Sequence, residues 1–299
     1  MPDRRIAVTT IGKIAQEALA QAHQASVVGM TSRGVFLRLT NRKVIFLSFE
    51  PYRGPLTLNL QEDSSCSMQL SRGAIASLYS HCIFFPAIGL SLLTSQAETW
   101  RAPMLPDICL PPDQRIARLR SIMRLADLDH ATSQLAALLP ALMGIHERSA
   151  PSGDELFNRV VRLQQARQED QFSTVADILK TFIGLGAGLT PAGDDLVIGF
   201  LLAANRWGDR LFPGLDVATL NKETQTDASR HTSTLSANLV ECASLGQADE
   251  RLILALDGIV TGQPDAGACV AALAAWGHTS GFDALAGMAL FLTTSPLTS

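Results

Sequence analysis

A glycine-rich stretch that runs straight into an apolar segment constrains the fold of this chain more than any other feature. It extends from Gly184 to Asp195, and the apolar segment Leu196–Ala204 follows it. The pattern is typical of a loop that opens a buried helix, with Thr190 as the N-cap, Pro191 in the first helical position and two aspartates in the first turn. Its four glycines let the backbone turn sharply or approach another group closely. The sequence therefore predicts a ligand site at this loop.

The same pattern recurs near the C-terminal end of the sequence. Gly193–Gly199 and Gly281–Gly287 both read G-x-D-x-x-x-G, so that Asp195 and Asp283 occupy the same place. Each motif follows a Gly-x-Thr tripeptide within a few residues and continues into an apolar segment. Two explanations stay open: a capping habit that many helix starts share, or two similar helix N-termini that converge on one pocket.

A helix N-terminus can bind an anion without a lysine, because its first N–H groups lack backbone partners and carry a partial positive charge. We therefore expect the amides of Gly193 and Gly281 to donate to a small anionic substrate. Three aspartates at these helix starts would repel that anion, namely Asp194, Asp195 and Asp283. At least one of them must then point elsewhere, accept hydrogen bonds from the ligand or hold a cation.

The neighbouring carboxylates of Asp194 and Asp195 also have a purely structural explanation. Acidic side chains in the first turn of a helix interact favourably with the helix dipole. A Mg²⁺ ion that bridges carboxylate and phosphate is the alternative, but two adjacent aspartates are weak support for a metal. We therefore predict no metal ligands and no cofactor, and keep Mg²⁺ as the alternative.

Two histidines belong to polar segments that could join such a site. His278 precedes Thr279 and Ser280, and its side chain is expected either to act as a general base or anion donor, or to cap and pack. His231 lies in the polar run Ser229–Thr234, where an exposed position is the default expectation. The remaining histidines show no metal-ligand spacing, and no Ser/His/Asp arrangement can be argued.

The glycine loop matches neither of two common nucleotide-binding loops. It lacks the Gly-Lys-Ser/Thr ending of a Walker A loop. A dinucleotide-binding turn follows a strand, whereas the preceding segment, Val175–Ile183, has helical spacing. ATP and dinucleotide binding are therefore poorly supported.

The composition indicates which classes of partner the chain binds and in which compartment it lies. The 299 residues are 47% hydrophobic and only 17% charged, with a formal net charge of −4 and no cluster of Lys or Arg. We therefore expect about two domains and no nucleic-acid or membrane partner. The five cysteines are widely spaced and form no C-x-x-C pair, which favours reduced thiols. With no signal-peptide core and apolar runs well short of the ~20 residues that cross a bilayer, the protein is expected to be cytoplasmic.

The first hundred residues alternate short β-rich runs with turn residues, after a segment of helical spacing over 11–23. The predicted strands are 27–30, 35–39, 44–49, 56–60, 67–70, 83–85 and 91–94. We expect an α+β protein whose N-terminal domain, residues 1–102, contains one helix and a small, mainly antiparallel β domain.

A proline-rich segment, residues 103–113, is expected to be a linker, because its closely spaced prolines exclude helix and suit a central strand poorly. An α-helical C-terminal domain, residues 114–299, is predicted to follow. Its expected helices are 114–125, 131–146, 154–167, 174–182, the segment after the glycine loop, 234–245, 249–261, 265–276 and 282–292. Residues 207–230 are expected to form a long polar connection.

At this point the residues carry a resemblance to a known family. The block GLGAGLTPAGDDLVIGF, together with WGHTSGFDALAGM, resembles the signature of an uncharacterised-domain family that includes the AllH-type subunit of oxamate carbamoyltransferase, from bacterial allantoin degradation. The two motifs are fairly specific in combination. The β-rich half is similar to the family in layout alone.

The resemblance implies a cytoplasmic protein that acts with two other subunits, one of them related to acyl-CoA synthetase-like proteins. Such a complex interconverts oxalurate plus phosphate with oxamate plus carbamoyl phosphate. Both substrates are small anions that N–H donors at helix starts could hold. The family's motif positions fall on Gly188, Thr190, Pro191, Gly193, Asp194, Asp195, Gly277, Thr279, Ser280, Gly281 and Asp283.

One departure bears on the chemistry. The Ser-Thr-Arg-Thr phosphate loop of ordinary carbamoyltransferases is absent, and Ser229–Thr232 is only superficially similar to it. Either the site has a different architecture or another subunit carries the chemistry.

Three hypotheses follow from these observations. In the first, the chain contributes an anion site, in which Asp195, Asp283 and His278 are catalytic. The substrate-binding residues would be Gly188, Thr190, Gly193, Asp194, Thr279, Ser280 and Gly281. In the second, the subunit is noncatalytic, and Gly199 and Gly287 let two helices approach closely. In the third, the chain is an independent small-anion-binding enzyme or sensor.

Overall fold

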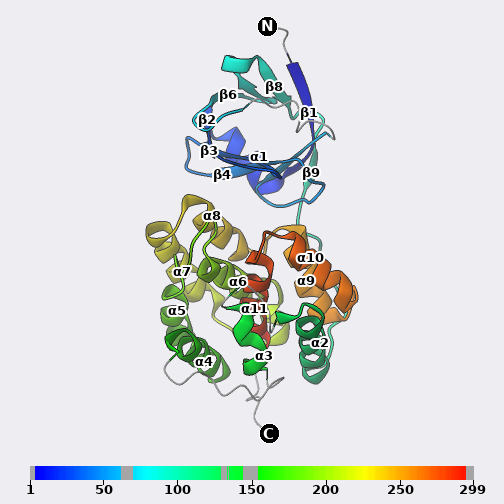
Figure 1. The fold of residues 1–299 in the computed structure, drawn as a ribbon, viewed down its shortest axis with the longest axis vertical. Helices are drawn as coiled ribbons and strands as arrows, with labels where there is room; N and C mark the ends of the chain where they lie inside the picture. Colours follow the sequence, from blue (N-terminus) through cyan, green and yellow to red (C-terminus); the bar gives the residue numbers. More distant parts are fainter. Residues whose placement is uncertain (1–3, 62–69, 129–132, 134, 144–153, 294–299) are drawn as a thin grey trace. The chain divides into compact units, whose positions relative to one another are not determined.

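The computed structural model describes residues 4–61, 70–128, 133, 135–143 and 154–293. The chain divides into two compact units, Met1–Pro103 and Met104–Ser299 (Figure 1). The first is built from strands around one short helix, and the second is helical among the described residues. An α+β organisation, as the composition of the two halves predicts, is therefore observed.

In its described residues, the first unit contains one sheet and one α-helix. The helix α1 spans Lys13–Ala20 and begins directly after the first strand. The strands are β1 (Arg4–Gly12), β2 (Gln24–Thr31), β3 (Gly34–Leu39), β4 (Val44–Ser48), β5 (Thr57–Leu60), β6 (Ile75–Tyr79), β7 (Cys82–Phe85), β8 (Leu90–Leu93) and β9 (Glu98–Trp100).

The sheet closes into an eight-stranded barrel of mixed strand orientation. The strands follow the order β5-β4-β3-β2-β6-β7-β8-β1, and an antiparallel pairing of β1 with β5 completes the ring. Parallel pairs join β1 to β8, β4 to β5 and β1 to the additional strand β9. The expectation of a small, mainly antiparallel β domain is therefore wrong. Local turn signals predict hairpins, but they carry no information about pairs between strands that are distant in sequence.

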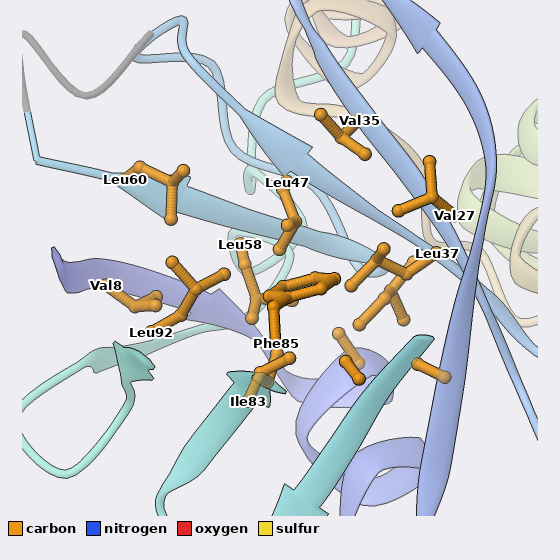
Figure 2. Packing of buried hydrophobic residues seen from close by; sticks show 14 of the residues in the cluster. Val8, Val27, Val35, Leu37, Leu47, Leu58, Leu60, Ile83, Phe85 and Leu92 are labelled. Atoms are coloured by element: carbon orange, nitrogen blue, oxygen red, sulfur yellow. The ribbon is translucent and has the colours of Figure 1, made fainter. Parts of the chain in front are cut away.

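Alternating apolar residues fill the interior of the barrel. Phe85 lies among Leu47, Leu58 and Leu37, whose side chains point toward one another (Figure 2). Ala15 of α1 belongs to the same buried cluster. Because the strands alternate inward and outward residues, this core holds the barrel together from within.

The N-terminal strand β1 was not expected from sequence. Its alternation, with Ile6 and Val8 buried, is short, and the predicted helix over 11–23 overlaps its end. Strands β6 and β9 were also missed, and the predicted strand 67–70 lies almost entirely outside the described residues. Barrel closure depends on β1, which pairs with β5, β8 and β9.

The second unit is an assembly of helices with two of them at its centre (Figure 1). The helices are α2 (Pro112–Leu125), α3 (Leu139–Leu142), α4 (Glu155–Gln168), α5 (Phe172–Lys180), α6 (Ala192–Leu211), α7 (Val217–His231), α8 (Thr234–Ala243), α9 (Glu250–Thr261), α10 (Ala266–Ala275) and α11 (Ser280–Leu292). A short 3-10 helix, η4 (Ala136–Leu138), leads into α3.

The central helices α6 and α11 begin with the two glycine motifs and pack against each other. A Cβ atom at Gly199 would lie 1.9 Å from the carbonyl oxygen of Ala284, and one at Gly287 would lie 1.9 Å from that of Leu196. Since Leu196 and Ala284 occupy equivalent motif positions, the contact is reciprocal. The hypothesis that these two glycines permit close helix packing is confirmed.

Residues 207–230 are helical over most of their length, which corrects the expected polar connection. Helix α6 continues to Leu211, and α7 begins after Asp216, whose side chain accepts a hydrogen bond from the Thr219 amide. The segment has few apolar residues, but Leu220 and Ala228 bury one face of α7. Tertiary packing thus stabilises a helix that weak periodicity concealed.

From Met104 on, the proline-rich segment belongs to the helical unit, and it makes hydrogen bonds to the helices of that unit. The Leu110 amide donates to the Val260 carbonyl at 2.8 Å. Arg210 donates to the carbonyls of Pro106 and Asp107. Farther along, the predicted helix 131–146 lies partly outside the described residues, and η4 and α3 form its described part.

The lengths and apolar character of the helices bear on the expectation that the chain has no membrane partner. Among the described helices, none combines the length and the apolar character that crossing a bilayer requires.

Candidate functional site

The two motif aspartates occupy matching places in the core of the helical unit. Asp195 is the fourth residue of α6, and Asp283 is the fourth residue of α11. Their exposed fractions are 1% and 0%. The two carboxyl groups lie close enough that the charge of Asp283 raises the pKa of Asp195. The structure thus brings together the two residues that the repeated motif predicts to be equivalent.

The Asp195 carboxyl group is buried without a hydrogen bond of ordinary geometry to any described residue. Burial raises its pKa well above the usual value, and the charges of Asp283 and Asp194 raise it further. The hydroxyl groups of Ser280 and Thr190 lie close enough to offset part of this rise. Burial and the neighbouring charges therefore shift this carboxyl group toward its protonated form.

The Asp283 carboxyl group is held on one side only. The Ser133 hydroxyl donates to its Oδ1, whereas Oδ2 has no partner among the described residues. Burial raises the pKa of Asp283 to about 6, although the hydrogen bond from Ser133 and the nearby Thr279 hydroxyl and Ala136 amide oppose the rise. This carboxyl group can therefore exchange a proton near neutral pH.

Asp194 differs from its neighbour because both of its oxygens accept hydrogen bonds. The Gly184 amide donates to Oδ1 at 2.7 Å, and the Thr232 hydroxyl donates to Oδ2. These contacts tie the glycine loop and the α7–α8 junction to the start of α6. Ser233 adds a hydrogen bond from its hydroxyl to the Leu189 carbonyl at 3.0 Å.

The amides of the motif glycines already have backbone partners. The Gly193 N–H donates to the Leu185 carbonyl at 2.9 Å, and the Gly281 N–H donates to the Trp276 carbonyl at 3.1 Å. The expectation that these two amides are open donors for an anion is therefore not met. A loop folded back over each helix start supplies the carbonyl, which sequence spacing does not reveal.

These glycines have a packing role instead. A Cβ at Gly193 would lie 2.0 Å from the Phe182 carbonyl oxygen, and one at Gly281 would lie 2.0 Å from that of Leu273. Any larger residue would push each helix start away from the segment before it.

The glycine loop itself is exposed and requires left-handed backbone. Gly184, Gly186 and Gly188 have φ values of 78°, 115° and 105°. Side chains other than glycine are strained in this region. After the loop, α6 begins one residue later than predicted, with Pro191 as its N-cap and Ala192 as its first residue. Thr190 therefore makes no capping bond.

Thr190 and Ser280 connect the two motifs directly. Their hydroxyl oxygens lie 3.3 Å apart, and both residues are half-buried. Because both hydroxyls also lie near Asp195, the starts of α6 and α11 share one polar cluster. We call the side chains of Thr190, Asp195, Ser280 and Asp283 the polar cluster. It lies between the exposed glycine loop and the buried helix pair.

The two candidate histidines lie at the surface. His278 is exposed, and its ring makes no hydrogen bond to Asp195 or Asp283 among the described residues. His231 is also exposed, with Nδ1 3.0 Å from Asp227 Oδ1. Neither ring is therefore hydrogen-bonded to the buried carboxyl pair in the described part of the chain.

Three hydroxyl residues near the motifs were missed by sequence reasoning. Ser133 supports Asp283, while Thr232 and Ser233 support the glycine loop. The polar run Ser229–Thr234 contained a signal for the latter two, whereas Ser133 is isolated in sequence. No group of three or more His, Cys, Asp or Glu side chains suited to a metal ion occurs among the described residues.

Comparison with known proteins shows a similarity over part of the chain. The model of the family described as oxamate carbamoyltransferase subunit AllH matches residues 182–292, just over a third of the chain. No curated protein and no solved structure matches the chain significantly. The matched region begins at the glycine loop and ends with α11, so it includes the whole polar cluster. Over these residues the chain is similar to the AllH family, as the two motifs predict.

Proposed function

We propose that this chain is a cytoplasmic subunit of an oxamate carbamoyltransferase complex in allantoin catabolism. The complex interconverts oxalurate plus phosphate with oxamate plus carbamoyl phosphate. Two other subunits, one of them acyl-CoA synthetase-like, complete it. The family description supports the transferase class and, through the word subunit, the existence of partners.

One observation carries the proposal. The family match covers residues 182–292, and within it two equivalent helix starts bring together two buried carboxyl groups and two hydroxyl groups. Buried carboxyl groups without full hydrogen bonding are costly, so a folded protein that keeps two of them side by side points to a function at that place.

The reaction requires one proton transfer. In the catabolic direction a phosphate oxygen attacks the ureido carbonyl carbon of oxalurate, and the bond from that carbon to the oxamate nitrogen breaks. The proton that phosphate gives up must reach this nitrogen, which leaves as the amide of oxamate. Asp195 and Asp283 are the proposed groups that carry the proton, and the exposed His278 is the third candidate.

The substrate-binding role is proposed for the residues around the pair. The Thr190, Thr279 and Ser280 hydroxyls can donate hydrogen bonds to phosphate or carboxylate oxygens. Gly188 keeps the exposed loop open to a substrate, and Asp194 positions that loop through its hydrogen bond from Gly184. For Gly193 and Gly281 we retain a positioning role, because their amides are engaged.

Reconstitution of the complex with variant subunits tests the proposal. Asp195→Asn and Asp283→Asn are expected to lower phosphate-dependent formation of oxamate and carbamoyl phosphate from oxalurate by about 100-fold or more, as expected for acid–base groups. The matched control is Asp209→Asn, an exposed aspartate on the same helix α6, which is expected to keep full activity. Size-exclusion chromatography checks that each variant still assembles.

Two results would contradict the proposal in different ways. Full activity in both core variants would leave the chain with a noncatalytic role, which the close packing at Gly199 and Gly287 also supports. A chain that purifies from its host without partners and converts a small anion alone would make it an independent enzyme.

A further inference from the structure

Three carboxylate oxygens inside the helical unit have no hydrogen-bond partner among the described residues. They are both oxygens of Asp195 and Oδ2 of Asp283, each with less than 1 Å² of accessible surface. A buried carboxylate in this state destabilises the folded protein unless a proton or a cation compensates its charge. No Lys, Arg or His side chain among the described residues forms an ion pair with either aspartate.

Other buried aspartates of the same unit are satisfied by the protein. Asp194 accepts from Gly184 and Thr232. Asp257 accepts from Arg206 at 2.8 and 2.7 Å and from Trp207 Nε1 at 2.8 Å. Among the buried aspartates that the structure describes, carboxylate oxygens without a partner thus occur only at the equivalent positions of the two motifs. Their matching positions favour one partner that both carboxyl groups share.

Two hydroxyl groups lie beside the Asp195 carboxyl group. Thr190 and Ser280 lie next to its carboxyl group, and their own contact of 3.3 Å is long for a hydrogen bond between hydroxyls. Both residues are half-buried, and Thr190 directly follows the exposed part of the glycine loop. The donor set consists of oxygen atoms alone.

An all-oxygen set with one or two carboxylates is typical of a hard divalent cation. Mg²⁺ in particular retains several waters and often ligates a substrate phosphate, so it does not need a cage of protein ligands. The absence of three or more His, Cys, Asp or Glu ligands among the described residues excludes a closed zinc-type site there but not this open arrangement.

We propose that Asp195, with the hydroxyl groups of Thr190 and Ser280, binds one hard divalent cation of the Mg²⁺ class, and that Asp283 is the second carboxylate facing it. The cation would satisfy the Asp195 oxygens and leave coordination positions for water or a phosphate oxygen, so that in the cation-bound form the proton transfer of the proposed reaction would fall to Asp283. The link to phosphate rests on the proposed function, whereas the cation site itself does not.

Metal titration of the full-length chain, stripped with EDTA and free of partner subunits and substrate, tests the site. Mn²⁺ serves as the probe, and electron paramagnetic resonance reports the free ion. We expect one Mn²⁺ per chain, displaced by Mg²⁺, with an affinity at least about tenfold lower in Asp195→Asn. Asp209→Asn, the exposed aspartate on α6, is expected to bind as the unmodified chain does.

Two further variants remove a ligand without changing charge. Neither the Thr190 nor the Ser280 side chain caps a helix in the structure. Thr190→Val and Ser280→Ala are therefore expected to fold, which circular dichroism checks. Both variants are expected to bind Mn²⁺ several-fold more weakly. Unchanged binding in both would overturn the proposal even if Asp195→Asn failed to fold. An absence of saturable Mn²⁺ binding to the unmodified chain would overturn it too, and would leave protons as the partners of the carboxyl pair.

The two proposals can fail separately. Mn²⁺ binding by the chain alone, combined with no transferase activity in the reconstituted complex, would remove the proposed function and keep the cation site. Full transferase activity in EDTA, with no Mn²⁺ binding, would remove the cation site and keep the proposed function.

Discussion

At the scale of single residues, the buried aspartates differ in what faces them. Asp257 faces a guanidinium and an indole N–H, so its charge is compensated inside the protein. Asp195 and Asp283 face hydroxyl groups and each other, and burial therefore raises the pKa of both. The polar cluster consequently stores unfavourable free energy at neutral pH when no cation is present.

A pH dependence of stability follows for Asp283 in metal-free protein. Its pKa is about 6 in the folded state against 3.8 for the unperturbed group, a difference that corresponds to about 3 kcal/mol. Between these values the folded state binds more protons than the unfolded state, so this contribution to the free energy of unfolding is fully present below pH 3.8 and is lost as pH rises through about 6.

Asp283→Asn is expected to remove that contribution to the pH dependence. Relative to the unmodified chain, the variant should gain stability as pH rises from about 4 to about 6 and remain more stable at pH 7, by at most about 3 kcal/mol. Urea unfolding in EDTA across this range measures the difference between the two proteins. Parallel curves for the two would show that Asp283 titrates normally.

At the scale of elements, the helix pair α6–α11 is set by two reciprocal glycine contacts. Each glycine lets its helix approach the backbone of the other, because a Cβ would overlap a carbonyl oxygen at 1.9 Å. The same contacts place the two helix starts side by side, so that Thr190 and Ser280 can touch. Opposite the polar cluster, buried Arg167 contacts Phe212, which follows α6, and Phe291 near the end of α11. This guanidinium lies where helix dipoles favour positive charge.

Alanine at either contact glycine should weaken the helix pair. For Gly199→Ala and Gly287→Ala we expect each substitution to lower the free energy of unfolding by about 1–3 kcal/mol, the range for overpacked cores, despite the better helix propensity of alanine. Asp209→Ala, an exposed position of α6, is the control and should stay within about 0.5 kcal/mol of the unmodified chain. Chemical denaturation gives all three values. Unaltered stability in the glycine variants would mean that the helices separate easily.

At the scale of the whole molecule, each of the two units has its own core. The barrel of the first unit is closed by the pairing of β1 with β5, which leaves few unpaired strand edges. Its interior cluster is drawn from residues of that unit alone. The second unit is organised around α6 and α11.

Residues 1–103 are therefore expected to fold without the helical unit. The isolated fragment should give a β-type circular dichroism spectrum and one cooperative thermal transition, because a closed barrel with its own core meets the requirements of an independent domain. A matched fragment that starts at Lys13 and lacks β1 should fail to fold, since the barrel cannot close. A disordered 1–103 fragment would show that the barrel depends on the rest of the chain.

Local signals predicted much of the helical unit and the centre of the site. Periodicity located most of its helices, and the repeated G-x-D-x-x-x-G pattern identified Asp195 and Asp283 as equivalent before their positions were known. Helix α7 was missed, because its buried face is narrow and only packing reveals it. The amide role expected for Gly193 and Gly281 failed for a similar reason, since a loop carbonyl that folds back is a tertiary contact.

The sequence by itself determined where most of the helices and several of the short strands lie, because caps, glycines and apolar spacing act over a few residues. It also determined the family resemblance of the region from Phe182 to Leu292. Only the tertiary structure decided that the strands close into a mixed barrel, and that Ser133 supports one motif aspartate while the other has no hydrogen-bond partner among the described residues. Strands pair, side chains are buried and buried charges are compensated through contacts between residues that are distant in sequence. Local propensity does not predict these contacts.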